Sequence, residues 1–289
     1  MSAGDRQTPP TDREPLPTCV NGLDELPAAF WSTLEEGLAQ AGLTTTPLER
    51  SLSPENHAAV DVHVRLLLAW NAAINLTAIR EPVAIAREHI VDSLAAVPLL
   101  RRAGVDEFLD IGSGAGFPGL PLGAALPARR ALLVESVGKK ARFLSVVADA
   151  NGIADRVHVA ATRAETLAAD PRHRERWQVV VARAVTDGVE LVELALPLLR
   201  PGGLLVAWKR LPLDDELART ERALRQLGGR IASVEPVHVA GLEDHVLAVV
   251  EKTAPTSGEF PRDPAARRRR PLGGAGGGVG GPGERARTP

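Results

Sequence analysis

The sequence predicts an α/β fold in which a doubly wound, mostly parallel sheet follows a mostly helical N-terminal region. After Gly104, short apolar runs such as Phe108–Ile111 and Val179–Ala182 alternate with segments of helical length. Near-continuous apolar strands are typical of a parallel sheet that is covered on both faces, and the segments between them supply right-handed crossover helices. Before Gly104, apolar residues recur at the spacing of a helix, as in Val60–Leu76.

The individual elements can be assigned in chain order. Two helices are predicted before the sheet, at Leu34–Ala41 and Val60–Leu76, and Lys139–Ala150 is predicted as a crossover helix with one apolar stripe. The last two strands, Arg230–Val239 and His245–Glu251, are joined by a loop too short for a crossover helix, so they should pair antiparallel. The remaining strands are predicted at Phe108–Ile111, Ala131–Val134, Arg156–Val159, Val179–Ala182 and Leu204–Ala207.

Composition separates the two ends of the chain from the middle. Residues 1–25 and 253–289 contain much Pro, Gly and polar sequence, which predicts a disordered leader and a disordered tail. Residues 26–104 are then expected to form a helical cap, and residues 105–252 are expected to form the core that contains the sheet. The strong basic run Arg267–Arg270 is expected to lie on a flexible arm.

Charge and cysteine content exclude several classes of protein. The 34 Lys and Arg residues against 36 Asp and Glu residues give a formal net charge of −2, so any contact with a nucleic acid must be local. One cysteine excludes a disulfide framework, a thiolate zinc site and an iron–sulfur cluster. No apolar run is long enough to span a membrane, and the first residues do not resemble a signal peptide. We therefore expect a cytoplasmic protein without a membrane span.

A strand that runs into a glycine-rich loop at Asp110–Gly119 is the most specific feature of the chain. Gly112, Gly114 and Gly116 allow a ligand to approach the backbone closely, and a helix N-terminus beyond the loop favours a nucleotide-like ligand. The loop also contains a literal G-x-G-x-x-G at residues 114–119. An oxidoreductase that binds NAD(P) is therefore one alternative.

Phe117 and Asp110 argue against a dinucleotide. In the dinucleotide fingerprint the first glycine ends the strand, which here is Gly112, and a small residue five positions later lets helix and strand pack closely. That position holds the bulky Phe117. Asp110 adds a carboxylate that would repel a pyrophosphate and attract the sulfonium or the amino group of S-adenosylmethionine. The sequence therefore favours this cofactor, bound at the glycines Gly112, Gly114 and Gly116 of the loop.

Polar residues at the ends of further strands complete the candidate site. Glu135 ends the second strand, where its carboxylate can accept both ribose hydroxyls. The loop after the third strand carries Ala164 and Glu165, whose backbone N–H and carboxylate can read the edge of adenine. Arg183 and Lys209 each follow a buried apolar strand, at the edge where ligands bind in open α/β folds. Surface ion pairs would explain these two cations as well.

Missing motifs narrow the chemistry further. Methylation of carbon 5 of a pyrimidine needs a cysteine nucleophile, and the single candidate, Cys19, lies in the leader. The Asn/Asp-Pro-Pro-aromatic motif of many amine methyltransferases does not occur, nor does a hydrolase elbow, a Walker phosphate loop or a zinc-binding H-E-x-x-H. A ring nitrogen that already carries a lone pair needs no general base. We therefore expect alignment of the reactants to provide most of the catalysis, and we assign no catalytic residue and no metal site.

Several motifs together resemble one known family, the bacterial small-subunit ribosomal RNA guanine-N7 methyltransferases, also called glucose-inhibited division protein B. The similarity covers about residues 55–252. Its combined pattern is far more specific than the glycine loop alone. The motifs are Trp70–Ile79, Glu88–Ser93, Asp110–Pro121, Ser136–Lys140 followed by Phe143 and Leu144, and Ala182–Ala184.

The resemblance implies a class I Rossmann-like methyltransferase with a seven-stranded, mostly parallel sheet and an N-terminal helical cap. It implies transfer of a methyl group from S-adenosylmethionine to N7 of one guanosine in 16S ribosomal RNA, either free or in the small-subunit particle. Gly112 and Phe117 would contact the cofactor, Ala164 and Glu165 its base, and Arg183 the cofactor end or the incoming guanosine. A catalytically inactive RNA-binding module is a second alternative.

The resemblance also nominates residues for the substrate side. Asn75, together with His89, Asp92 and Ser93, matches N-terminal motifs of the family and would line the cleft, although a hydrogen-bond network at a helix end is an equal interpretation. Lys209 matches a family lysine, but Arg210 stands where the family usually has glycine. The leader and the Arg-rich tail lie outside the similarity, so no function is inherited there.

Overall fold

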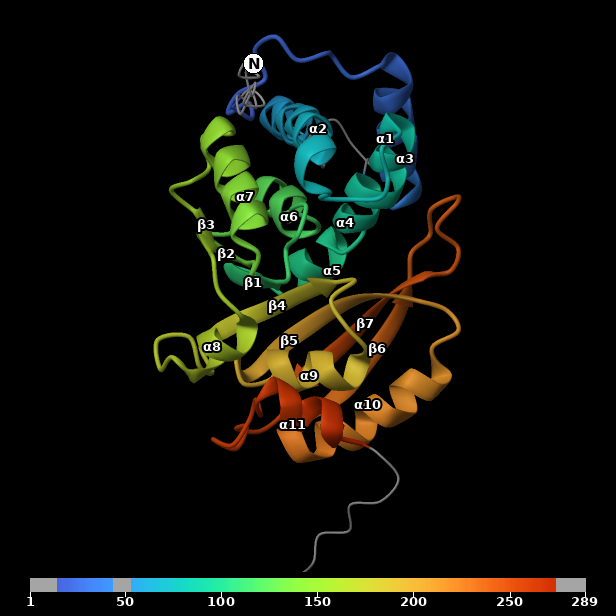
Figure 1. The fold of residues 1–289 in the computed structure, drawn as a ribbon. Helices are drawn as coiled ribbons and strands as arrows, with labels where there is room; N and C mark the ends of the chain where they lie inside the picture. The colour runs from blue at the N-terminus through green and yellow to red at the C-terminus, as the bar shows by residue number, and fades with distance from the viewer. Residues whose placement is uncertain (1–14, 44–52, 274–289) are drawn as a thin grey trace, which may run out of the picture.

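A seven-stranded sheet with the order β3-β2-β1-β4-β5-β7-β6 forms the centre of the fold (Figure 1). The computed structural model describes residues 15–43 and 53–273. Neighbouring strands among β1–β5 pair parallel, and β7 pairs antiparallel with both β5 and β6, which confirms the predicted mostly parallel sheet. The strands are β1 (Glu107–Ile111), β2 (Arg130–Val134), β3 (Val157–Ala160), β4 (Trp177–Arg183), β5 (Leu199–Arg210), β6 (Gly229–Pro236) and β7 (His245–Lys252).

Helices cover the two faces of the sheet, with α1–α7 above it and α8–α11 below it in Figure 1. The upper layer contains α1 (Ala28–Gln40), α2 (Pro54–Ile74), α3 (Pro82–Ile85), the π-helix η1 (Ala86–Val91), α4 (Asp92–Leu94), α5 (Val97–Arg102), α6 (Gly119–Ala125) and α7 (Gly138–Ala150). The lower layer contains α8 (Ala164–Ala169), α9 (Gly188–Ala195), α10 (Asp214–Leu227) and α11 (Pro264–Arg269).

Alternation along the buried strands produces these two layers. In β4, Val179 and Val181 pack with the core of the upper layer, whereas Val180 and Ala182 pack with the core of the lower layer. Because successive side chains of a strand point to opposite faces, an uninterrupted apolar run is what a sheet covered on both sides needs. The apolar runs that predicted the strands are therefore explained by burial on both faces.

Local signals set the ends of the long helices. Helix α2 begins at Pro54, earlier than the predicted Val60, because the Ser53 hydroxyl accepts a hydrogen bond from Asn56 N (3.3 Å) and proline fits the first helical position. It ends where Asn75 adopts a left-handed φ of 50°. Helix α10 ends at Gly228, whose φ is 77°.

The structure corrects the predicted disorder at both ends of the chain. Residues 15–25 lie against α2, where Trp70 Nε1 donates a hydrogen bond to Pro17 O (2.8 Å). Residues 253–273 are also ordered, since Phe260 and Leu272 are buried in the core of the lower layer. The composition of these segments predicted disorder, but a few apolar and charged anchors are enough to hold them. The predictions for residues 1–14 and 274–289 lie outside the described residues.

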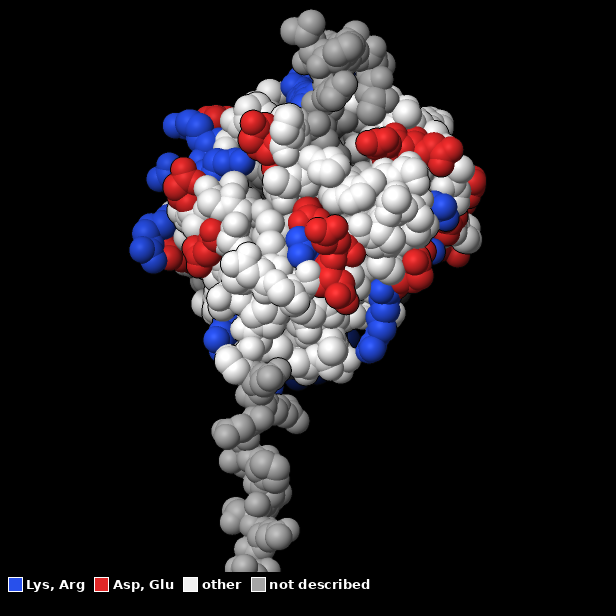
Figure 2. Space-filling model, turned by 90° about the horizontal axis from the view of Figure 1, so that it is seen from above, with Lys and Arg blue, Asp and Glu red and all other residues white. Residues whose placement is uncertain are grey.

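Charge is mixed on the face above the upper helices. Figure 2 looks down on this face and shows Lys and Arg side chains interspersed with Asp and Glu side chains on the part that the structure describes. The pattern agrees with the formal net charge of −2. Attraction of a polyanion to this face as a whole is therefore not expected, and contacts with RNA must depend on local groups.

Candidate active site

The glycine loop lies at the carboxyl end of β1. Gly112, Gly114 and Gly116 have φ angles of 68°, 53° and 91°, which residues other than glycine rarely adopt. A Cβ atom at Gly114 would meet only Gly112 O, at 3.7 Å, so the backbone there is open to a ligand. A Cβ atom at Gly116 would lie 2.4 Å from Leu120 Cδ1 and 3.0 Å from His63 Nε2. Gly114 therefore forms the open part of the loop, whereas a Cβ atom at Gly112 would lie 3.0 Å from Val185 Cγ2 and Gly116 packs behind the loop.

Glu135 joins this loop to the end of β2. Its carboxylate accepts hydrogen bonds from Gly114 N (3.0 Å) and Val137 N (2.7 Å), and the residue is 7% exposed. Each carboxylate oxygen can accept a second hydrogen bond, so the group can still bind hydroxyls. The predicted position of Glu135 beside the glycine loop is thus observed, with a role in holding the loop.

Asp110 is a buried carboxyl group beneath the loop. Its Oδ2 accepts a hydrogen bond from Gly119 N (3.1 Å), whereas its Oδ1 has no partner among the described residues. Burial raises the pKa of Asp110 to about 7, so the carboxyl group is only partly ionised at neutral pH. The negative charge that the sequence analysis used against a pyrophosphate is therefore weaker than expected. The backbone N–H of Gly119, the first residue of α6, already donates its hydrogen bond to Asp110.

Asp110→Asn is expected to stabilise the protein at high pH. The pKa of Asp110 in the folded state lies above the ordinary value of 3.8 for an aspartate, so this group lowers stability progressively as the pH rises from about 4 to about 7. The amide cannot ionise, and the variant should gain about 4 kcal/mol at about pH 8 and almost nothing near pH 4. Urea unfolding of both proteins across this range measures the difference. A difference independent of pH would contradict the buried, protonatable state of Asp110.

Phe117 lies between two imidazole rings. The ring centroids of His63 and His89 are each 4.6 Å from that of Phe117. Burial lowers the pKa of His63 to about 4 and that of His89 to about 3, with the charge of Arg183 contributing in both cases, so both rings are neutral. His63 Nε2 lies 2.8 Å from Ala115 O, to which it can donate a hydrogen bond that supports the loop. Phe117 is 4% exposed, which makes its ring part of this stack.

Arg183, at the end of β4, is held by a buried polar network. Its Nη1 donates hydrogen bonds to Asp92 Oδ2 and Glu88 O, both at 3.0 Å, and its Nη2 lies 3.1 Å from His89 Nδ1. His245 Nδ1 lies 2.9 Å from the other Asp92 oxygen. The guanidinium carbon is 5.2 Å from the centroid of the Phe117 ring. Arg183 is thus fixed in one orientation by groups from η1 and α4, and His245 of β7 contacts Asp92 in turn.

A cavity of about 370 Å³ opens beside this network, within the size range of small-molecule sites. It brings together Arg183 and Lys209, the two cations that the sequence placed at strand ends. Lys209 Nζ contacts Glu216 Oε1 (2.6 Å) and Thr186 O (3.1 Å). The cavity is lined by Ile79, Glu88, His89, Asp92, Arg183, Ala184, Thr186, Trp208, Lys209, Arg210 and His245.

The glycine loop, Phe117 and Glu135 do not line this cavity, and three further predicted site residues also lie outside it. Asn75 is exposed and ends α2, so the structure supports the helix-end interpretation of this residue over a place in the cleft. Ala164 and Glu165 begin α8, directly after the loop that follows β3. Glu165 Oε1 accepts a hydrogen bond from Arg267 Nη2 (3.3 Å), a residue that the sequence analysis placed on a flexible arm. Arg267 is 6% exposed, and that expectation is wrong.

Sequence reasoning missed three residues of the site, His63, Trp208 and His245. Trp208 Nε1 donates a hydrogen bond to Asp92 O (2.8 Å), which helps to fix the acid between Arg183 and His245. In the sequence, Trp208 and His245 belong to apolar strands and His63 to an amphipathic helix. No local pattern distinguishes them, since their roles depend on partners far away in the chain.

The described residues show neither a metal centre nor a membrane-spanning helix. No group of three or more His, Cys, Asp or Glu side chains in ranges 15–43 and 53–273 is arranged to hold a metal ion. Within the same ranges, no helix is both long enough and apolar enough to cross a bilayer.

Comparison with known proteins identifies the family. Residues 56–246 match the family model described as rRNA small subunit methyltransferase G. The chain belongs to this family. Proteins named ribosomal RNA small subunit methyltransferase G are 44% identical in Chloroflexus aggregans, over 79% of this chain and 95% of the relative, and 34% identical in Streptococcus pyogenes, over 85% and 99%.

One solved structure supports the fold independently. An O-methyltransferase from Bacillus cereus in complex with SAH aligns with a TM-score of 0.52 and 16% sequence identity, covering 77% of this chain and all of that chain. The class I methyltransferase fold that the sequence analysis predicted for this chain is therefore confirmed. The family match contains the glycine loop, Glu135, Arg183 and Lys209, whereas α11 lies beyond its end at residue 246.

Proposed function

We propose that this chain transfers the methyl group of S-adenosylmethionine to N7 of a guanosine in 16S ribosomal RNA. Membership of the rRNA small subunit methyltransferase G family over residues 56–246 is the observation that carries this proposal. The site fits the reaction because N7 of guanine has a free lone pair, so no proton has to be removed before it attacks. The neutral His89 and the ion-paired Arg183 then serve to position groups, without a general base in the step.

The residues around the glycine loop suit the cofactor. The open backbone at Gly114, the Glu135 carboxylate and the unpartnered Oδ1 of Asp110 offer the shape and the acceptors that an adenosine and an ammonium group require. When bound, the cofactor supplies an electrophilic methyl carbon on a sulfonium. Gly112, Gly114 and Glu135 would hold its ribose end, and Ala164 and Glu165 its base. Gly116 and Phe117 would support the loop from behind.

The substrate guanosine would enter the cavity at the carboxyl ends of β4 and β5, beside η1. Arg183 and Lys209 line it and carry positive charge, which suits the acceptor O6 edge of guanine or a neighbouring phosphate. Both cations are already paired with carboxylates, so their orientation is set before RNA binds. The proposed partner is 16S ribosomal RNA, free or in the small-subunit particle, and its shape and unpaired bases would provide most of the specificity.

Methyl transfer to ribosomal subunits tests this function. Purified protein is incubated with labelled S-adenosylmethionine and small subunits taken from cells that lack the activity, and the label is mapped by base-specific cleavage at N7-methylguanosine. We expect one labelled guanosine in 16S ribosomal RNA and no incorporation into subunits from methylation-competent cells. Cofactor binding without incorporation into any RNA would favour an inactive RNA-binding module, and calorimetric binding of NAD alone would favour an oxidoreductase.

A further inference from the structure

The C-terminal segment 253–273 packs beneath the sheet, beyond the end of the family match. Phe260 and Leu272 are buried among residues of α8–α10. Arg174 donates hydrogen bonds to Phe260 O (2.8 Å) and Thr256 O (3.0 Å), so the segment is tied to the lower layer by its backbone as well. Helix α11 is consequently a fixed part of this chain.

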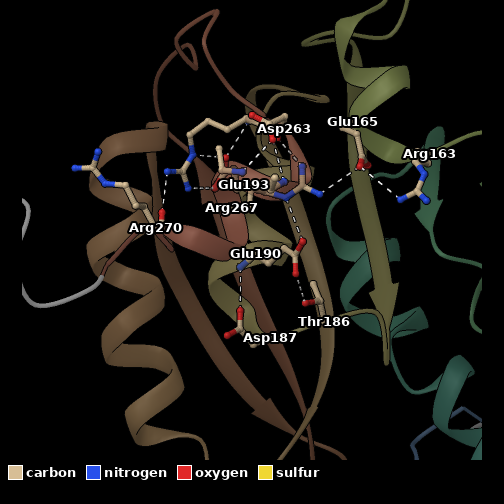
Figure 3. A network of polar contacts seen from close by, with 12 residues as sticks. Arg163, Glu165, Thr186, Asp187, Glu190, Glu193, Asp263, Arg267 and Arg270 are labelled. Carbon is tan, nitrogen blue, oxygen red and sulfur yellow. Dashed lines mark hydrogen bonds and ion pairs between the residues drawn. The ribbon is translucent and has the colours of Figure 1, made fainter.

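Arg267 on α11 joins two elements that follow sheet strands (Figure 3). Its Nη2 donates to Glu165 Oε1 (3.3 Å) at the start of α8, and its Nε donates to Glu190 Oε1 (3.1 Å) in the first turn of α9. Its Nη1 donates to Arg262 O (2.7 Å). One guanidinium thus links α8, the helix after β3, to α9, the helix after β4, and the rigid fork geometry of arginine suits such a bridge.

Glu165 depends on Arg267 for its orientation. The side chain of Glu165 is 18% exposed, and its other cationic neighbour, Arg163, is 4.0 Å away and 67% exposed. Exposed pairs at this distance contribute little to orientation. Without Arg267, the Glu165 and Glu190 carboxylates would face the same space with no cation between them, and repulsion would turn Glu165 outward.

The position of α11 does not depend on Arg267 alone. Arg262 forms a two-pronged ion pair with Glu193, through Nε–Oε1 (2.8 Å) and Nη2–Oε2 (2.6 Å), and Glu193 is 1% exposed. Asp263 caps α11 by accepting hydrogen bonds from Ala265 N (2.9 Å) and Ala266 N (3.0 Å). Substitution of Arg267 should therefore leave the segment docked, which separates its effect on Glu165 from loss of the helix.

We propose that Arg267 is a positioning residue for cofactor recognition: it holds the Glu165 carboxylate so that the amino group of adenine can donate a hydrogen bond to it. This inference rests on the proposed function, in which Glu165 contacts the cofactor base. The C-terminal segment then completes the adenosine end of the site, from outside the region that matches the family model. Helix α11 is in this sense part of the binding site.

Two nucleosides that differ at the adenine amino group test the proposal. S-adenosylhomocysteine carries this group, and S-inosylhomocysteine replaces it with an oxygen. Titration calorimetry of the full chain should show that Arg267→Ala weakens binding of S-adenosylhomocysteine about tenfold, the loss expected for a hydrogen bond to a charged group. The affinity for S-inosylhomocysteine should change less than about twofold. The ratio of the two affinities, which measures the preference for adenine, should therefore decrease. In Glu165→Gln, removal of Arg267 should have little further effect.

Controls separate this role from a structural one and from failure of the proposed function. Arg269→Ala, an exposed arginine on the same helix, should leave both affinities unchanged. Equal weakening for both nucleosides, unchanged affinity or tighter binding in Arg267→Ala would overturn the proposal. If Arg267→Ala does not fold, Arg267→Lys keeps the charge, loses the fork and allows the same comparison. Absence of binding by the unsubstituted chain would instead refute the cofactor assignment.

Discussion

Arg183→Ala is expected to reduce methyl transfer to the small subunit by about 100- to 1000-fold, the usual loss when one preorganised charged donor is removed from an active site. Arg183 is held between Asp92, Glu88 O and His89 and lines the proposed guanosine cavity, so no other side chain can replace its fork. Single-turnover transfer of labelled methyl measures the loss. The Michaelis constant for the cofactor should change much less than turnover.

Arg183→Ala is also expected to lower the free energy of unfolding. A side chain that only faced a cleft could be removed without this loss of stability. Asp92 is 1% exposed and would lose its ion pair with Arg183, which costs about 3 kcal/mol when the carboxylate that remains is buried. Adding Asp92→Asn removes the uncompensated charge, so the double variant should recover stability in urea unfolding but not activity. A double variant with recovered stability and full activity would show that Arg183 has only a structural role.

Glu135→Ala is expected to weaken binding of S-adenosylmethionine about 100-fold. The carboxylate is the acceptor for Gly114 N and Val137 N and the proposed acceptor for the ribose hydroxyls, and each hydrogen bond to a charged group contributes about 1.5 kcal/mol or more. Loss of the carboxylate therefore removes direct contacts and loosens the glycine loop at once. Titration calorimetry with the cofactor measures the effect.

Two further variants calibrate this result. Glu135→Gln keeps the size and one acceptor oxygen, so its affinity should lie between those of the alanine variant and the original chain. Asp155→Ala removes an exposed carboxylate before β3 and should leave binding unchanged. If Glu135→Ala bound the cofactor with undiminished affinity, the ribose assignment would be wrong and Glu135 would serve the loop alone.

Some of the site was predictable because its signals are local. The glycines of the loop need backbone conformations or close approaches that other residues cannot adopt, and Glu135 and Arg183 directly follow apolar runs. In a parallel sheet, the ends of such runs meet at one edge, so residues far apart in the chain could be assigned to one site. The same logic placed Lys209 beside Arg183, where the cavity contains both.

Other parts of the site could not be predicted, because they depend on contacts across the fold. Asp92 and His245 are separated by 153 positions and meet only after β7 has paired with β5. The partly protonated state of Asp110 results from complete burial, which the loop sequence does not reveal. Asn75 matches a family motif, yet its left-handed conformation serves the end of α2.

The C-terminal segment shows the limit of composition as a guide. Its Pro, Gly and Arg content predicted disorder. The segment is ordered because Phe260 and Leu272 pack into the apolar core of the lower layer and Arg262 forms an ion pair with the buried Glu193. Periodicity and glycine spacing report interactions within a few residues, and they were sufficient to predict the sheet, its crossovers and the position of the glycine loop. Burial of charge and the pairing of distant side chains arise only when the layers close around them, and those contacts fix the state of Asp110, the orientation of Arg183 and the place of Arg267.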